Sequence, residues 1–309
     1  MQEGRVHLKE KQFISIIKNL LKSEYIGDDC AYVKDLGIVV SQDSLVEGVH
    51  FLLECITPFQ LGYKSVMVNL SDIASSGAEP KYLTVSLSLP DNVDADFIKE
   101  FYSGMKYACG NGIKIIGGDI TGADKIFISV CAIGKTQGRN ISSRKNAQIG
   151  QKVIVSGVHG SSSAGLKLLK EKKTEPQCLI KSHLEPKAQI EFGKNIGINV
   201  SGKYSMMDSS DGLMETLSTI AYESGVLLNI DFDKIPYDKE IERFENWHDL
   251  VLFGGEDYQI IATVPLEYQG GIEIGKVEKG SGVDLSISGQ IIHYSKSDVD
   301  KKIFNHFKV

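Results

Sequence analysis

Aspartates recur in this sequence where a predicted strand or a glycine turn ends. Asp28 and Asp29 lie in a glycine turn. Asp43 follows a predicted strand, and Asp119 follows a pair of glycines. Loops that follow strands are where α/β proteins usually place their sites. Carboxylates that converge without basic partners repel one another, and magnesium relieves this repulsion because it binds carboxylate, water and phosphate oxygens. The pattern therefore suggests an acid-lined, metal-filled cleft that holds a polyphosphate.

Three further aspartates extend this set. Asp72 lies late in a predicted helix, and Asp208 and Asp211 lie between a short predicted strand and a helix. Each aspartate taken alone is more often a turn former or a helix cap than a metal ligand. Asp208 and Asp211 are therefore also open to interpretation as caps of the helix that follows them. The metal interpretation depends on the set as a whole.

Familiar phosphate-binding signatures do not explain the sequence. Gly134-Lys135-Thr136 resembles the end of a Walker A loop, but Ser129 stands where that loop needs its first glycine. No G-x-G-x-x-G motif occurs either. The loop 157–163 precedes a predicted helix, and it either offers backbone N–H groups to an anion or, as is commoner, simply caps the helix. A lone histidine such as His50 is usually structural.

The bulk properties argue against several classes of protein. A net charge of −6 is unfavourable for general nucleic-acid binding, which depends on basic residues that neutralise phosphates. The 5 cysteines contain no C-x-x-C pair, which argues against a zinc site or a disulfide framework and favours reduced thiols in the cytoplasm. The sequence shows no signal peptide and no apolar run long enough to span a membrane.

Predicted helices and strands mix throughout the chain. Helices are expected over 10–22, 57–76, 94–109, 164–170 and 212–223. Strands are expected over 31–33, 37–40, 82–89, 113–116, 126–133, 152–156, 204–207, 227–232 and 258–264. The helix over 57–76 has the clearest limits, because Thr57-Pro58 favours a helix start and Gly77 a helix stop. Beyond about residue 270 the pattern is hard to interpret.

The length and composition predict two domains. A chain of 309 residues is long enough for two, and the stretch 135–151, rich in small and polar residues, has the composition of a linker. We therefore expect an α/β or α+β protein with domains at 1–137 and 138–309.

Several short stretches, taken together and in order, are similar to one enzyme family. The most specific are Asp43-Ser44-Leu45-Val46-Glu47-Gly48-Val49-His50-Phe51 and Gly254-Gly255-Glu256-Asp257-Tyr258. The others are residues 26–31, 68–74, 77–80, 116–119, 165–166, 208–213 and His183-Leu184-Glu185-Pro186. On these residues the chain resembles thiamine-monophosphate kinase, a family related to aminoimidazole-ribonucleotide synthetase.

The resemblance implies a fold and a reaction. The fold would be that of aminoimidazole-ribonucleotide synthetase, with an N-terminal domain that binds ATP and magnesium and forms a homodimer. A C-terminal α/β domain would close over the site. The reaction would be Mg²⁺-dependent transfer of the ATP γ-phosphoryl group to thiamine monophosphate, giving thiamine diphosphate and ADP. Because the acceptor is already an anion, direct in-line transfer needs metal ions and alignment rather than a strong general base.

The resemblance also implies roles for single residues. The implied magnesium ligands are Asp29, Ser41, Gln42, Asp43, Asp72, Asp119, Asp208 and Asp211. The implied ATP contacts are Gly118, Asp119, Arg144 and Ser210. The implied contacts with thiamine monophosphate are His50, Glu256 and Phe304. The choice between Asp28 and Asp29 as the metal ligand stays open.

The sequence departs from the family pattern at a few positions. Gln42 stands where threonine is usual, and Ile120 replaces the first of two threonines. The segment 264–275 is too short for a helix that many relatives have there, which leaves the substrate wall open to question. Two alternatives follow. One is another ATP-dependent enzyme of the superfamily, and the other is a non-catalytic protein that binds nucleotide or thiamine phosphate.

Overall fold

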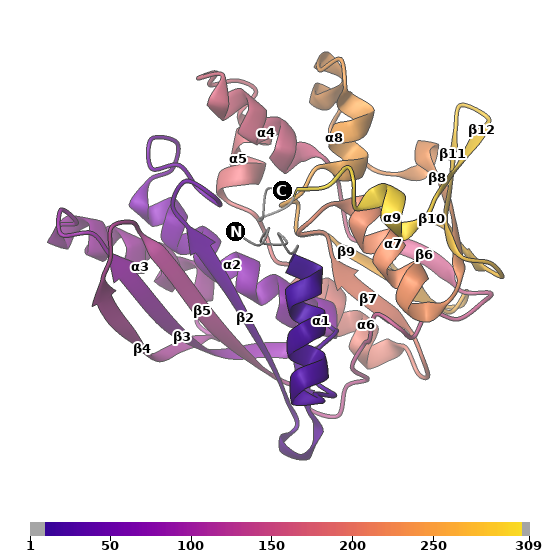
Figure 1. The fold of residues 1–309 in the computed structure, drawn as a ribbon, viewed down its shortest axis with the longest axis horizontal. Coiled ribbons are helices and arrows are strands. Elements are labelled where there is room, and N and C mark those ends of the chain that lie inside the picture. The colour runs from indigo at the N-terminus through magenta and orange to yellow at the C-terminus, as the bar shows by residue number, and fades with distance from the viewer. Residues whose placement is uncertain (1–9, 305–309) are drawn as a thin grey trace, which may run out of the picture.

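The structure is a computed structural model that describes residues 10–304, and its strands form two sheets (Figure 1). The first sheet contains β1 (Ala31–Val33), β2 (Ile38–Val46), β3 (Glu79–Leu89), β4 (Lys114–Gly122) and β5 (Phe127–Lys135). The second contains β6 (Lys152–Val155), β7 (Ser205–Asp208), β8 (Leu227–Asp231), β9 (Ile260–Val264), β10 (Ile272–Glu278), β11 (Gly282–Ile287) and β12 (Gln290–Tyr294). The strand orders are β1-β2-β5-β3-β4 and β12-β11-β8-β10-β6-β9-β7. The mixed α/β class predicted from the sequence is therefore confirmed.

The helix α2 (Pro58–Ser76) has the predicted limits. Thr57 and Gln60 form a reciprocal capping box at its start, and Gly77 ends it in the left-handed conformation at φ 86°. The helix contacts β2, β3 and β5 in the first half of the chain, and α6 (Ile190–Asn199) and β7 in the second. It therefore lies at the junction of the two halves.

A second helix, α3 (Ala95–Cys109), packs directly on α2. Gly62 and Gly104 make this possible, because a Cβ atom on either would lie 1.9 Å from a backbone carbonyl oxygen of the other helix. The predicted helix at the start of the described chain is also present, as α1 (Glu10–Leu21).

Two strands are longer than predicted. β2 continues through Asp43, and β4 continues through Asp119, so both aspartates lie within strands rather than after them. β4, which includes most of the apolar stretch 113–116, is an edge strand, and almost all of its residues are exposed. Pairing with β5 and β3 holds these polar residues in extended backbone, and such pairing has no local signal in the sequence.

The second half contains more helices than predicted. The expected helices are present as α4 (Ser161–Lys170) and α7 (Leu213–Ser224). The sequence did not reveal α5 (Gln177–Leu184), α6, α8 (Trp247–Phe253) or α9 (Lys296–Val299). The chain between β9 and β10 forms turns and no helix, in keeping with the short segment there. None of the helices within residues 10–304 has the length and apolar character needed to cross a membrane.

Candidate functional site

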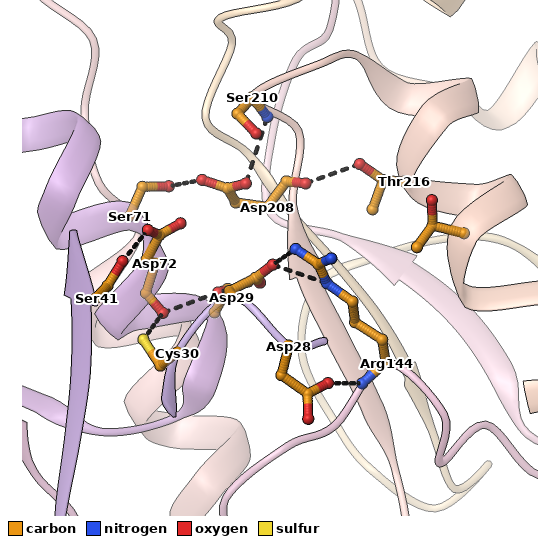
Figure 2. A network of polar contacts seen from close by, with 12 residues as sticks. Asp28, Asp29, Cys30, Ser41, Ser71, Asp72, Arg144, Asp208, Ser210 and Thr216 are labelled. Atoms are coloured by element: carbon orange, nitrogen blue, oxygen red, sulfur yellow. Dashed lines mark hydrogen bonds and ion pairs between the residues drawn. The ribbon is translucent and has the colours of Figure 1, made fainter. Parts of the chain in front are cut away.

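Three aspartates come together where α2 meets the second half of the chain. Asp72 lies on α2, Asp208 ends β7, and Asp29 lies just before β1. Figure 2 shows their side chains directed toward one another from these three elements. Each carboxylate accepts a hydrogen bond from a serine hydroxyl, and the donors are Ser75 for Asp29, Ser41 for Asp72 and Ser71 for Asp208. Together with Asp43, which is considered next, they are called the aspartate cluster.

The electrostatics of the aspartate cluster are unfavourable in the absence of a cation. Burial, then the neighbouring Asp29, raises the pKa of Asp43 to about 6 and the pKa of Asp208 to about 7. Burial, then Asp43 and Asp208, raises the pKa of Asp72 well above its ordinary value. These carboxylates repel one another in a desolvated space. A bound cation would relieve that repulsion.

Asp28 and Asp29 have different environments. The Asp28 carboxylate accepts hydrogen bonds from the backbone N–H of Arg144 at 2.7 Å and from the Ser143 hydroxyl at 2.9 Å. Asp29 pairs with the Arg144 guanidinium through Nε at 3.0 Å and through Nη2. Asp28 therefore holds the backbone of the loop after β5, whereas Asp29 belongs to the aspartate cluster.

A cavity adjoins this pair of aspartates. Its volume is about 870 Å³, and its lining includes Tyr25, Tyr32, Ser142, Lys145 and Asn146 as well as Asp28 and Asp29. Pockets for nucleotide-sized ligands usually have volumes of roughly 300–1,000 Å³. The cavity is thus large enough for a nucleotide whose phosphates point toward the aspartate cluster.

The first sheet separates Asp119 from the aspartate cluster. Asp43 pairs with Val130 on β5, and Val130 pairs with Val85 on β3. Val85 in turn pairs with Gly118 on β4. Asp119 is the next residue, so its side chain lies on the opposite face of the sheet from that of Asp43. Three strand spacings also separate β2 from β4, roughly 14 Å. One chain alone does not bring Asp119 to the cluster.

Gln42 lies on the same face of the first sheet as Asp119, the outer face, which points away from the aspartate cluster. Its Nε2 donates a hydrogen bond to the Ser129 hydroxyl at 3.0 Å, on the face opposite Ser41 and Asp43. Only its backbone carbonyl remains as a possible ligand beside Asp43. Gly118, on the inner face, is required by packing, because a Cβ atom there would lie 1.8 Å from the Val85 carbonyl oxygen.

The other predicted residues lie outside the helices and strands. The Ser210 backbone N–H lies 3.4 Å from an Asp208 carboxylate oxygen, and the charge of Asp211 contributes to the raised pKa of Asp43. His50 accepts a hydrogen bond at Nδ1 from the Val46 backbone at 3.0 Å, which leaves Nε2 as the protonated nitrogen of the neutral ring. Phe304, just after α9, is exposed.

The loop 157–163 binds a carboxylate from within the chain. The backbone N–H groups of Gly160 and Ser162 donate to Asp257 at 2.6 and 2.9 Å. Asp257 is buried and follows Glu256, which adopts a positive φ of 66°. The loop is therefore a capping loop whose donors are already used, and the site has to hold phosphates by other means.

Several functional polar residues on α2 were not predicted from the sequence. Ser71 and Ser75 hold Asp208 and Asp29, and Lys64 is fully buried at 1 % exposure. Their spacing was the available signal, since Lys64, Ser71 and Ser75 recur along one side of a helix that is mostly buried. Polar residues at helical spacing in a buried helix indicate a buried polar site rather than a solvated face.

The donors of the cluster fit magnesium. They are carboxylate and hydroxyl oxygens, the ligands that hard divalent cations prefer. Within residues 10–304, no group of three His, Cys, Asp or Glu side chains is arranged to hold a metal ion without help. Magnesium commonly takes one or two carboxylates and completes its shell with water and substrate phosphates. The arrangement suits ions that bind together with a phosphorylated ligand.

Comparisons with known proteins agree with this arrangement. The family described as AIR synthase related protein, N-terminal domain, matches residues 27–136. A thiamine-monophosphate kinase of Aquifex aeolicus is 38% identical over 294 residues, which cover 89% of this chain and 94% of the relative. The corresponding kinase of Bacillus subtilis is 34% identical over 308 residues, with 92% and 93% covered.

A solved structure described as AaThiL complexed with AMPPCP and TMP superposes with a TM-score of 0.88 at 36% identity. The match covers 99% of this chain and 100% of that one. The fold is therefore that of the aminoimidazole-ribonucleotide synthetase superfamily, as the sequence predicted. Since the identity and coverage extend over both halves of the chain, this protein belongs to the thiamine-monophosphate kinase family.

Proposed function

We propose that this chain transfers the γ-phosphoryl group of ATP to thiamine monophosphate, with thiamine diphosphate and ADP as products. The observation that carries the proposal is the aspartate cluster at the junction of the two halves, beside a cavity of about 870 Å³. The similar AaThiL structure contains AMPPCP, an ATP analogue, together with TMP. Both substrates are therefore expected at the same junction here.

The chain's own residues would bind and align the phosphates. Asp29, Asp43, Asp72 and Asp208 would hold Mg²⁺, with Ser41, Asp211 and the Gln42 carbonyl beside them. The ions would neutralise charge on the ATP phosphates and on the acceptor phosphate. Arg144 would reach the nucleotide phosphates, and Gly118 and Ser210 would contact the nucleotide. No residue needs to remove a proton, because the acceptor oxygen is already anionic.

We further propose that the active protein is a homodimer whose sites are shared. β4 pairs with β3 alone among the described strands, and its exposed residues include Ile116 and Ile120 at 57% and 64% exposure. Exposed apolar edge strands usually find a partner. A second copy beside this edge would bring its Asp119 to the aspartate cluster of the first copy. The first copy's own Asp119 cannot reach that cluster.

The remaining assignments also belong to this proposal. His50, Glu256 and Phe304 would contact thiamine monophosphate. The chain would divide into an N-terminal domain at 1–137 and a C-terminal domain at 138–309, a boundary that lies between the two sheets. A cytoplasmic location suits the 5 cysteines, all of them free thiols.

The test is an end-point assay with purified protein, ATP and thiamine monophosphate, with and without Mg²⁺. Chromatography would quantify thiamine diphosphate and ADP. Equal amounts of both products, formed only with Mg²⁺, are expected. ADP without thiamine diphosphate, or magnesium-dependent nucleotide binding without any product, would replace this proposal with one of the two alternatives named above.

A further inference from the structure

We infer that Lys64 and His183 are positioning residues that fix the carboxylate of Glu256 for the acceptor substrate. The inference rests on the proposed function, in which Glu256 contacts thiamine monophosphate. The stretch His183-Leu184-Glu185-Pro186 is among those similar to the family, but the resemblance implies no role for His183. The inference supplies one.

A buried cation approaches Glu256 from the first half of the chain. Lys64 Nζ lies 3.4 Å from each of the two carboxylate oxygens of Glu256. Its third contact is the carbonyl oxygen of His183, at 3.1 Å. The Lys64 side chain is 1% exposed, whereas Glu256 is 25% exposed. Glu256 therefore has one side against the protein and another side available to a ligand.

His183 holds the same carboxylate from the second half of the chain. Its Nδ1 lies 3.3 Å from Glu256 Oε2 and 3.0 Å from the hydroxyl of Ser162. The ring is buried, and burial followed by the charge of Lys64 lowers its pKa to about 4. The ring thus lies against the carboxylate without adding a charge, and the Nδ1 hydrogen bond with Ser162 fixes its orientation.

The backbone around Glu256 also needs this support. Glu256 has a φ of 66°, and Tyr258 has a φ of 51°, values that non-glycine residues rarely adopt. The Glu256 N–H donates to the Ser210 carbonyl at 2.7 Å, and the buried Asp257 carboxylate fills the N-terminus of α4. Such conformations persist at functional sites when their surroundings hold them.

Burial of a lone ammonium is unfavourable, which explains why the Lys64 ammonium lies beside the Glu256 carboxylate. An unpaired buried cation costs several kcal/mol, so Lys64 keeps a carboxylate close to it. The pair joins α2 to the loop before β9 and so links the two halves of the chain. Its predicted effect on the reaction is to keep Glu256 in one orientation, which lowers KM for the acceptor and leaves nucleotide binding alone.

The experiment measures KM and kcat for both substrates in Lys64→Gln, His183→Asn and Glu256→Gln. We expect KM for thiamine monophosphate to rise about tenfold in each, the size of one lost charge-assisted hydrogen bond. KM for ATP should stay within about twofold. The Lys64→Gln/Glu256→Gln double variant should be no worse than Glu256→Gln alone, because Lys64 acts through Glu256. Lys64→Arg should recover part of the loss.

A matched control separates positioning from general stability. Lys296 pairs with Glu215 at 2.5 Å, with side-chain exposures of 17% and 4%, on α9 and α7. Lys296→Gln should lower Tm without a selective change in KM for thiamine monophosphate. Equal rises of both KM values in Lys64→Gln, or additive losses in the double variant, would overturn the inference. If Lys64→Gln does not fold, His183→Asn provides the same comparison.

Calorimetric titration of thiamine monophosphate keeps this inference distinct from the proposed function. Wild-type protein that binds thiamine monophosphate but yields no product contradicts the kinase proposal only, and weaker binding by His183→Asn would still support positioning. Wild-type turnover with unchanged binding and KM in the variants contradicts the positioning role only. Wild-type protein that neither binds nor reacts contradicts both.

Discussion

Asp43 and Asp119 lie on opposite faces of one sheet, on strands that have β5 and β3 between them. Ordinary strand spacing puts the two strands roughly 14 Å apart, too far for their carboxylates to share a metal ion bound at about 2.1 Å. If both aspartates serve one site, as the family resemblance implies, they come from different chains.

Complementation between inactive variants tests the shared site. Asp43→Asn and Asp119→Asn proteins should each lose most activity. After the two are unfolded together and refolded, half of the dimers would be mixed, and each mixed dimer would have one intact site. Activity should then recover to about a quarter of wild type, since the symmetry of a two-fold dimer gives this fraction.

Two observations would contradict this arrangement. Activity that stays at background in a mixture with proven subunit exchange would place both aspartates in the site of a single chain. A protein that sediments as a monomer at full activity would exclude the shared site altogether.

Asp43→Asn should also stabilise the metal-free protein. The folded pKa of Asp43 is about 6, above the ordinary value of 3.8. A raised folded pKa contributes stability below pH 3.8 that is lost as the pH rises through 6. The variant should therefore match wild type near pH 4 and exceed it at pH 7.5 by on the order of 2 kcal/mol.

Urea unfolding in EDTA at the two pH values measures this difference. Addition of Mg²⁺ and ATP should then stabilise wild type more than the variant, since ligand binding adds stability. A variant that is less stable than wild type at pH 7.5 in EDTA would show that repulsion within the aspartate cluster does not lower the free energy of unfolding.

His159 should make the protein sensitive to acid. The ring is fully buried, and neither of its nitrogens has a hydrogen-bond partner within the described chain. Burial lowers its pKa from 6.5 to about 3, so its contribution to stability is present above pH 6.5 and is lost as the pH falls toward 3. Wild type should lose about 1.4 kcal/mol per pH unit relative to His159→Leu across this range.

Unfolding of both proteins between pH 6.5 and 4 gives the slope. Parallel curves for wild type and His159→Leu would mean that the ring gains access to water or to a partner in solution.

Gly104→Ala should destabilise the contact between α2 and α3. The added Cβ atom would lie 1.9 Å from the Phe59 carbonyl oxygen, so the helices would have to move apart. We expect a loss of about 1–3 kcal/mol in the free energy of unfolding, as for other overpacked interiors. Gly112→Ala is the control, since nothing lies within 4 Å of its Cβ position. Equal Tm values for the two variants would contradict the close packing.

The sequence predicted the elements whose limits are set locally. Thr57, Pro58 and Gly77 supply the caps of α2, and those signals depend only on neighbouring residues. The ends of β2 and β4 were missed because Asp43 and Asp119 are poor strand formers that are extended by their pairing partners. The helix α5 was missed because it is short, with no side-chain cap.

The site was predictable in its residue types and only partly in its geometry. A family pattern names Asp43 and Asp119 together, and it contains no information on which face of a sheet each occupies. Successive side chains of a strand point to opposite faces, so the face of each aspartate can be worked out only once the limits and pairing of its strand are known. The role of Lys64 depends on a contact across 192 residues of sequence, which no local pattern predicts.

The helix α2 has a consequence for which ligands fit. It carries Lys64 in its first half and Asp72 in its last two turns, and a rise of 1.5 Å per residue puts them about 12 Å apart along the axis. A helix clamped to α3 by backbone contact cannot shorten or lengthen that distance. A ligand that reaches from Glu256, which Lys64 holds, to the aspartate cluster must have its ring system and its phosphate at a matching separation. Free thiamine has no phosphate to place at the aspartate cluster, so the chain would select its acceptor by the spacing of ring system and phosphate as well as by charge.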